Sequence, residues 1–131
     1  MQYIQPMPTI APRGFAAVAN DHIEAPLDLH LLMVRHPAAT FLMRANGQSM
    51  NPAVKNGDLL VVDRSLDARD GNIVIASVNG ELLVRRLFKR GGILTLLPEN
   101  RDYSPIDVTT GFDFQVWGVV TYIVRDTCTP S

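Results

Sequence analysis

The spacing of apolar and polar residues predicts that most of this chain forms β-strands. Residues 40–44 alternate between the two kinds, and branched apolar residues dominate the segments that follow. The predicted strands cover residues 40–44, 58–64, 72–78, 81–88, 93–97 and 114–124. Asn79-Gly80 is a strong signal for a two-residue hairpin turn between the third and the fourth of these strands. The last strand is the most apolar, which predicts a place at the centre of the sheet or at a subunit contact.

The N-terminal part of the sequence follows a different pattern. Residues 28–36 are predicted to form one short helix, because leucines and a methionine make an apolar stripe along them. Asp28 can cap the start of this helix, and His36-Pro37 ends it. Prolines interrupt residues 1–27 without periodicity, so this segment is predicted to be an extended arm. The chain is therefore expected to comprise an arm over 1–27 and a mostly β domain over 28–131.

Composition and charge narrow the class of protein further. The chain has 131 residues, of which 47% are hydrophobic and 19% charged, enough for one compact domain. With a net charge of −1 and a pI near 6.3, no nucleic-acid-binding surface is expected. Cys128 is the only cysteine, so no internal disulfide can form, which fits a reducing cytoplasm. No apolar run approaches the roughly 18 residues of a membrane-spanning helix.

The histidines do not suggest a metal centre. His22, His30 and His36 lack the spacing of a metal site. His36 stands before Pro37 and is expected to end the helix rather than to bind a ligand. Neither a metal ion nor an organic cofactor is therefore predicted.

Ser49 is the first candidate for chemistry. It lies in Gly47-Gln48-Ser49-Met50, and a serine in such a turn is most often structural. Gly47 lets the backbone come close to a carbonyl group, and amides beside Ser49 could form an oxyanion hole. The hairpin at Asn79-Gly80 would bring a residue near position 85 back beside the serine. A serine and a neutral lysine in that arrangement form a dyad that needs no histidine or carboxylate.

Position 85 holds an arginine instead of a lysine. A guanidinium group stays protonated and has no lone pair with which to accept the proton of Ser49. Lys55 and Lys89 are the only lysines in the chain. Lys89 would lie about 13 Å from position 85 along a strand, and Lys55 is expected to be a solvated charge of a loop. Lysine-type catalysis is therefore not expected from the sequence as it stands.

Several motifs together give the chain a resemblance to a known family. They are His36-Pro37-Ala38-Ala39-Thr40, Gly47-Gln48-Ser49-Met50, Gly57-Asp58-Leu59-Leu60-Val61-Val62-Asp63, Asn72-Ile73-Val74-Ile75-Ala76, Val84-Arg85-Arg86-Leu87, Leu97-Pro98-Glu99-Asn100, Tyr103-Ser104-Pro105-Ile106 and Trp117-Gly118-Val119-Val120. With these motifs the chain resembles the UmuD-type SOS mutagenesis proteins, within the LexA/UmuD family of self-cleaving serine proteases. The expected lack of a helix-turn-helix segment before the arm favours the UmuD type over the LexA type.

The resemblance implies a fold, a reaction and partners. In the family, a mostly β peptidase domain cuts its own N-terminal arm when a RecA filament on single-stranded DNA stimulates it. The nucleophile corresponds to Ser49, and the general-base lysine corresponds to Arg85. The bond that matches the family's cleavage site is Arg13-Gly14, although family members usually have alanine or cysteine in place of Arg13.

Three functions follow as hypotheses. The first is a cytoplasmic, homodimeric UmuD-like subunit that assists an error-prone translesion polymerase of the UmuC-like Y family, with RecA-stimulated cleavage impaired by Arg85. The second is a non-catalytic module of the same fold that binds the polymerase or RecA. The third is a relative of signal peptidases, which share the serine-lysine core. The expected lack of a membrane anchor counts against this third hypothesis.

Overall fold

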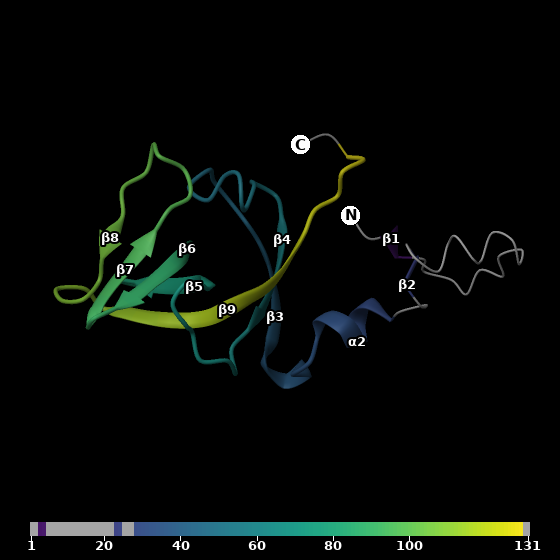
Figure 1. The fold of residues 1–131 in the computed structure, drawn as a ribbon, viewed down its shortest axis with the longest axis horizontal. Helices are drawn as coiled ribbons and strands as arrows, with labels where there is room; N and C mark the ends of the chain where they lie inside the picture. The colour runs from purple at the N-terminus through teal and green to yellow at the C-terminus, as the bar shows by residue number, and fades with distance from the viewer. Residues whose placement is uncertain (1–2, 5–22, 25–27, 130–131) are drawn as a thin grey trace, which may run out of the picture. The chain divides into compact units, whose positions relative to one another are not determined.

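The computed structural model describes residues 3–4, 23–24 and 28–129 (Figure 1). The chain divides into two units, Met1–Arg35 and His36–Ser131, which are described separately. In the first unit, β1 (Tyr3–Ile4) and β2 (Ile23–Glu24) pair in parallel. The other residues of the predicted arm over 1–27 lie outside the described part of the chain.

The first unit also contains α2 (Leu29–Met33), which is shorter than the predicted range 28–36. Asp28 caps this helix as predicted, because its carboxylate accepts a hydrogen bond from the His30 amide at 3.0 Å. The helix ends early because Val34 leaves the helical region of backbone angles, with φ −112° and ψ 88°.

The second unit is built on one antiparallel sheet. After a 3₁₀ turn, η1 (Pro37–Ala39), its strands are β3 (Thr40–Arg44), β4 (Leu59–Asp63), β5 (Ile73–Val78), β6 (Glu81–Arg90), β7 (Ile93–Leu97), β8 (Ile106–Asp107) and β9 (Phe114–Val124). Their spatial order is β3-β4-β9-β5-β6-β7-β8, and each neighbouring pair is antiparallel. β9 lies between β4 and β5, so the most apolar segment occupies the centre of the sheet (Figure 1). The mostly β fold class is confirmed.

The six predicted strands are all present, with small differences at their ends. β3, β7 and β9 have the predicted bounds, whereas β6 continues to Arg90, beyond the predicted range 81–88. In the hairpin turn between β5 and β6, φ is 50° at Asn79 and 85° at Gly80. These two left-handed residues make the kind of turn that suits a two-residue hairpin. β8 escapes prediction because its two residues are too few to show a pattern.

Both faces of the sheet are covered around β5. Val74 and Ala76 belong to one buried apolar cluster, whereas Ile75 belongs to another. Because alternate residues of a strand point to opposite faces, β5 is buried from both sides. The cluster of Ile75 also contains Met50, which is only 1% exposed and follows Ser49 in the sequence. The hydrophobic core therefore anchors the turn that carries the candidate serine.

β9 passes β4 at a point where only a glycine fits. Gly118 pairs with Ile75 of β5 beside a shift in the register of the two strands. A Cβ atom at Gly118 would lie 2.6 Å from Cγ1 of Val62, a fully buried side chain of β4. The missing side chain of Gly118 thus makes room for Val62.

We predict that Gly118→Ala lowers the free energy of unfolding by about 1–3 kcal/mol, because over-packing displaces well-packed neighbours. Urea denaturation followed by circular dichroism measures this change. Val62→Ala removes the clashing methyl group, so Gly118→Ala should cost less in a Val62→Ala background than in the wild-type protein. An equal cost in both backgrounds would mean that the contact with Val62 is not the cause.

Candidate active site

Ser49 lies in the loop between β3 and β4. The base of this loop is closed by a hydrogen bond from the Ala45 amide to the Asp58 carbonyl, at 2.8 Å. Further along, Gly47 has a φ of +103°, a backbone conformation that favours glycine. The Gly47 amide donates to Oδ1 of Asn56 at 2.9 Å. The loop is therefore tied across itself at two levels before it reaches the serine.

A second loop, which follows β7, holds the backbone of Ser49. The amides of Glu99 and Asn100 both donate to the Ser49 carbonyl, at 3.0 Å each. The Asn100 side chain also donates from Nδ2 to the Gln48 carbonyl, at 2.9 Å. Glu99 is itself fixed by Arg86, whose Nε donates to the carboxylate at 2.6 Å. Three hydrogen bonds from one loop thus orient the serine turn.

The hydrogen bonds by which Glu99 and Asn100 clamp the serine turn leave no local signal in the sequence. Glu99 and Asn100 are part of a motif that carries the family resemblance, but the local pattern does not say which backbone they contact. The hydrogen bond from Asn100 to Gln48 joins residues 52 positions apart. Only the tertiary structure brings the two loops together.

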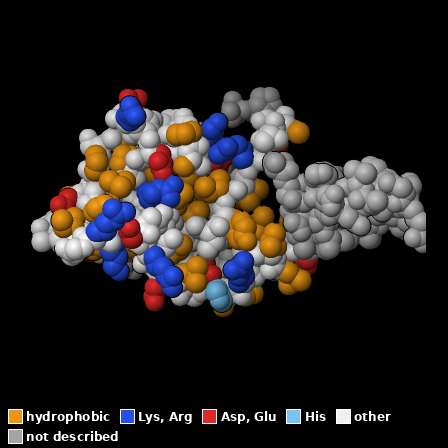
Figure 2. All heavy atoms as spheres, viewed as in Figure 1, with side chains coloured by type: hydrophobic (Ala, Val, Ile, Leu, Met, Phe, Trp, Pro, Cys, Tyr) orange, Lys and Arg blue, Asp and Glu red, His pale blue; other side chains and the backbone are white. Residues whose placement is uncertain are grey.

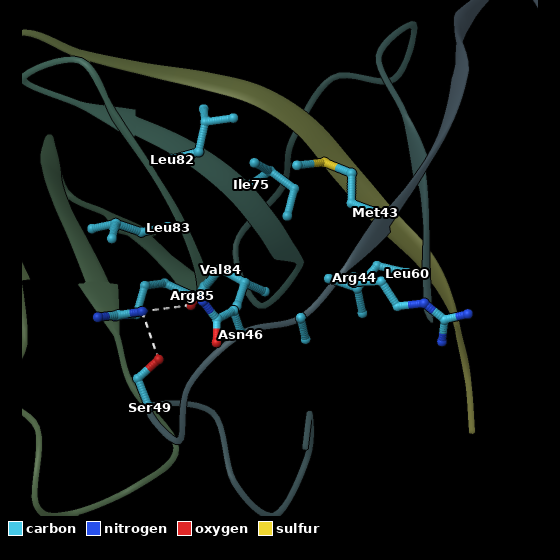
Figure 3. Close-up of a pocket in the computed structure, with 11 residues that line it drawn as sticks. Met43, Arg44, Asn46, Ser49, Leu60, Ile75, Leu82, Leu83, Val84 and Arg85 are labelled. Atoms are coloured by element: carbon cyan, nitrogen blue, oxygen red, sulfur yellow. Dashed lines mark hydrogen bonds between the residues drawn. The ribbon is translucent and has the colours of Figure 1, made fainter. Parts of the chain in front are cut away.

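Arg85 lies against Ser49 in the second unit. It is on β6, where it pairs with Val74 of β5. Its Nη1 donates hydrogen bonds to Oγ of Ser49 at 2.7 Å and to the Val84 carbonyl at 2.8 Å (Figure 3). Ser49 and Arg85 are each only 9% exposed. The structure therefore brings together, away from most water, the two residues that the sequence singles out.

Arg85 is a buried cation without a carboxylate partner. Among the described residues, none of the ion pairs includes Arg85, and its Nε is buried without a hydrogen-bond partner. Burial lowers the pKa of Arg85 below its usual value, whereas the charges of Tyr103 and Glu81 act in the opposite direction. A guanidinium group remains protonated at neutral pH all the same. It therefore donates to Ser49 and offers no lone pair for the serine proton.

Several hydrogen-bond donors of the serine turn have no acceptor among the described residues. Across the described part of the chain, no hydrogen bond uses the amide of Ser49 or Met50 as its donor. The Ser49 hydroxyl accepts from Arg85, and its own proton is likewise not donated to any described residue. Free amides next to a serine are the groups that stabilise an oxyanion in acyl transfer. The turn thus offers a hydroxyl and candidate oxyanion donors, without a lysine.

A pocket of about 140 Å³ opens beside Ser49 and Arg85. Much of its wall is apolar and includes Met43, Leu60 and Ile75 (Figure 3). The charged residues of its lining are Arg44 and Arg85, and no carboxylate is among the described residues that line it. The pocket therefore suits a small apolar group better than a cation.

Neither lysine of the chain lines this pocket. Lys89 is exposed on β6, and its amide donates to Oδ1 of Asp70 at 2.9 Å. Lys55 is exposed in the serine loop, where its amide donates to Oδ2 of Asp58 at 2.8 Å. The structure thus offers no lysine amine beside Ser49 in place of the one that the family uses.

The other residues singled out by the sequence do not join this site. The predicted cleavage bond, Arg13-Gly14, lies outside the described residues. His36 does not cap α2, and its Nδ1 is instead 2.6 Å from Oδ2 of Asp63. Cys128 is exposed near the C-terminal end. In the described ranges there is no cluster of three or more potential metal ligands, and no helix there is long and apolar enough to cross a membrane.

Charged side chains are mixed over the surface of the second unit. Figure 2 shows lysine and arginine side chains at several separate places on the viewed face, some of them beside acidic ones. Two such pairs on or next to β6 are Arg86 with Glu99 and Arg90 with Asp70. Arg85 differs from both of these arginines because it is buried and forms no ion pair with a described residue.

An ion pair fastens the end of the serine loop to the end of β9. Arg125 donates from Nε and Nη2 to the two carboxylate oxygens of Asp58, both at 2.7 Å. These bonds lower the pKa of Asp58 below its usual value, although burial acts in the opposite direction; a hydrogen bond from the Lys55 amide also lowers it. Asp58 is only 2% exposed. The charged form of this carboxylate therefore holds the loop in place.

Comparisons with known proteins show what this chain is similar to. The model of the Peptidase S24-like family matches residues 7–121. Protein ImpA of Escherichia coli is 42% identical over 119 residues, which are 87% of this chain and 78% of ImpA. Protein MucA of Escherichia coli is 40% identical over 111 residues, 83% of this chain and 75% of MucA. The LexA repressor of Shewanella baltica is 37% identical over 115 residues, 86% of this chain and 55% of the repressor.

We predict that Asp58→Asn destabilises the protein at neutral pH and that the difference from wild type shrinks in acid. Since the folded state lowers the pKa of Asp58, its charge stabilises the fold above about pH 4. This contribution disappears as the pH falls through the lower, folded-state pKa. Urea denaturation at a series of pH values measures the effect.

Asp67→Asn is the control for this prediction, because Asp67 is exposed and its carboxylate accepts no hydrogen bond from a described residue. This variant should follow the wild-type pH profile. A constant difference between Asp58→Asn and wild type at all pH values would contradict the proposed electrostatic role of Asp58.

Proposed function

The chain belongs to the Peptidase S24-like family in its LexA/UmuD branch, and from this premise we propose that it is an UmuD-like SOS-response protein. In this role it is a cytoplasmic homodimer and an accessory subunit of an error-prone, UmuC-like translesion DNA polymerase. It responds to RecA filaments on single-stranded DNA. Its cleavage of its own arm, at Arg13-Gly14, is impaired because Arg85 occupies the position of the general base.

The proposal that cleavage is impaired rests on one observation, the hydrogen bond from Arg85 to Oγ of Ser49. A serine nucleophile must lose its proton to a base as it attacks the carbonyl of the bond to be cut. In a serine-lysine dyad the neutral amine takes this proton. A guanidinium group that already donates to the serine oxygen cannot do so. The nucleophile is therefore oriented but not activated.

The lining of the pocket supports a second obstacle to cleavage. Arg44 and Arg85 line it, and no described residue of the lining is acidic. If the side chain before the cut bond enters this pocket, Arg13 would bring a third positive charge into it. Like charges at short range in a partly buried site repel each other appreciably. Binding of the Arg13-Gly14 bond at Ser49 is thus disfavoured as well.

The hydrogen bond from Arg85 to Ser49 also favours a second candidate function. In this alternative the chain is a non-catalytic module that binds the polymerase or RecA through the retained fold. In this case the arm is never removed, and the full chain is the working form. Co-purification of a Y-family polymerase with the uncleaved protein supports this candidate. Binding only after the arm has been removed supports the first.

We predict that the wild-type protein gives no fragment beginning at Gly14 when it is incubated with RecA, single-stranded DNA and a nucleotide, even at alkaline pH. Arg85→Lys supplies an amine that can lose its proton, so cleavage should rise by a factor of about 100 or more. Mass spectrometry of the products identifies the fragment and its first residue.

Two variants control this experiment. Arg90→Lys makes the same exchange at the far, exposed end of β6 and should leave the protein uncut. The double variant Ser49→Ala with Arg85→Lys should also remain intact, because it lacks the nucleophile. If Arg85→Lys fails to cut while it remains folded, and fails also in combination with Arg13→Ala, which removes the charge before the cut bond, the role proposed for position 85 is wrong. Efficient cleavage by the wild-type protein would overturn the proposal that Arg85 impairs the protease.

A further inference from the structure

The positive charge of Arg85 is incompletely compensated, and this makes the cleft beside it a candidate site for an anion. Arg85 is only 9% exposed, and burying its positive charge costs free energy unless an anion or several hydrogen bonds compensate it. Arg85 has two hydrogen bonds from one nitrogen, to Ser49 and Val84, while its Nε has none. No described residue forms an ion pair with it. The compensation is incomplete, so an anion that reached Arg85 would be bound favourably.

The serine turn next to Arg85 contains further hydrogen-bond donors. The Ser49 hydroxyl accepts from Nη1 at 2.7 Å, which leaves its own hydrogen free to point elsewhere. The amides of Ser49 and Met50 have no acceptor among the described residues. Hydroxyl, amide and guanidinium groups are all donors from which the oxygens of a carboxylate accept hydrogen bonds. Without a base, this group of donors can bind a negatively charged oxygen without any reaction.

The pocket next to these donors limits the size and polarity of the group that carries the carboxylate. Its volume of about 140 Å³ is close to that of a cavity that holds one benzene molecule. Met43, Leu60 and Ile75 line it, so a small apolar side chain fits its chemistry. Apolar side chains beside cationic donors, with Arg44 as a second positive charge in the lining, are the arrangement expected for a short acid with an apolar body.

The strand next to the pocket favours a peptide over a free small acid. Among the described strands β3 lies at an edge of the sheet, where it pairs with β4 alone. Its last residues, Met43 and Arg44, line the pocket. Unpaired backbone groups of an edge strand can hydrogen-bond an extended peptide, whose alternate side chains then enter pockets.

We propose that this cleft binds the C-terminal carboxylate of a peptide that ends in a small apolar residue, with Arg85 and Ser49 as the carboxylate ligands. The last side chain occupies the pocket, and the preceding residues extend along β3. The inference rests on the proposed function in one respect, that the cleft does not cut peptides efficiently. The ligand class is a peptide with a free C-terminal carboxylate, and its site has Arg85 in the position of the family's general base.

The test uses the full chain and two probes, N-acetyl-alanyl-alanine with a free carboxylate and the same dipeptide as its C-terminal amide. Titration followed by NMR of the isotope-labelled protein measures both dissociation constants and locates the perturbed amides. The acid should bind at least about tenfold more tightly than the amide, since it gains charge-assisted hydrogen bonds. Amides of residues 49, 50 and 84–85 should shift. Inorganic phosphate, tested alone, should bind more weakly than the acid because it cannot fill the apolar pocket.

Matched variants of two arginines test whether Arg85 causes the tighter binding of the acid. Arg85→Met should weaken binding of the acid at least about tenfold and leave binding of the amide unchanged. It is expected to fold, because replacing an uncompensated buried charge by an apolar side chain is often neutral or stabilising. Arg90→Met removes an exposed arginine from the same strand and should change neither constant. Thermal unfolding of both variants verifies that they are folded.

The outcomes separate this inference from the proposed function. Equal binding of acid and amide, tighter binding of phosphate, or no binding up to about 10 mM would overturn the carboxylate site. Each of these results is compatible with an arm that stays uncut, so the impaired protease would stand. Retention of acid binding by folded Arg85→Met would also refute the role of Arg85. Cleavage of the arm by the wild-type protein would instead refute the proposed function.

Discussion

The hydrogen bond from Arg85 to Ser49 joins the two segments on which the site depends. It connects the loop after β3 to β6, across 36 positions of the sequence. Because both side chains are largely buried, water competes weakly for the bond, and its electrostatic component is strong. The guanidinium group orients the serine oxygen and leaves its proton in place. The orientation of Ser49 and the proposed loss of cleavage thus have one structural cause.

The contact persists because the serine turn is held from three sides. Met50 inserts into the hydrophobic core under the turn. Glu99 and Asn100 hold the Ser49 carbonyl from the loop after β7. Asp58 ties the end of the loop to β9, through its ion pair with Arg125. These attachments come from different parts of the second unit, so the position of Ser49 is a property of the whole sheet.

Exchanging lysine for arginine in such a cleft separates affinity from reactivity. Both side chains carry a positive charge and several donors, so both can attract a carbonyl or carboxylate oxygen. Only an amine whose pKa is lowered by burial becomes a base near neutral pH. Burial also lowers the pKa of Arg85, but a guanidinium group starts too high for this change to release its proton. A site of this shape can therefore bind groups that it does not cut.

The sequence alone determined the strands, the hairpin at Asn79-Gly80, the cap at Asp28 and the family, because these depend on local patterns and on motifs. It also identified Ser49 and Arg85. The folded structure alone shows that Arg85 donates to Ser49, that Glu99 and Asn100 clamp the turn, and that no described carboxylate forms an ion pair with Arg85. The end of α2 and the short strand β8 likewise depend on backbone geometry and pairing that no local pattern records. The reason is physical, since hydrogen bonds and burial depend on distances between segments far apart in the chain, and residue order alone does not contain those distances.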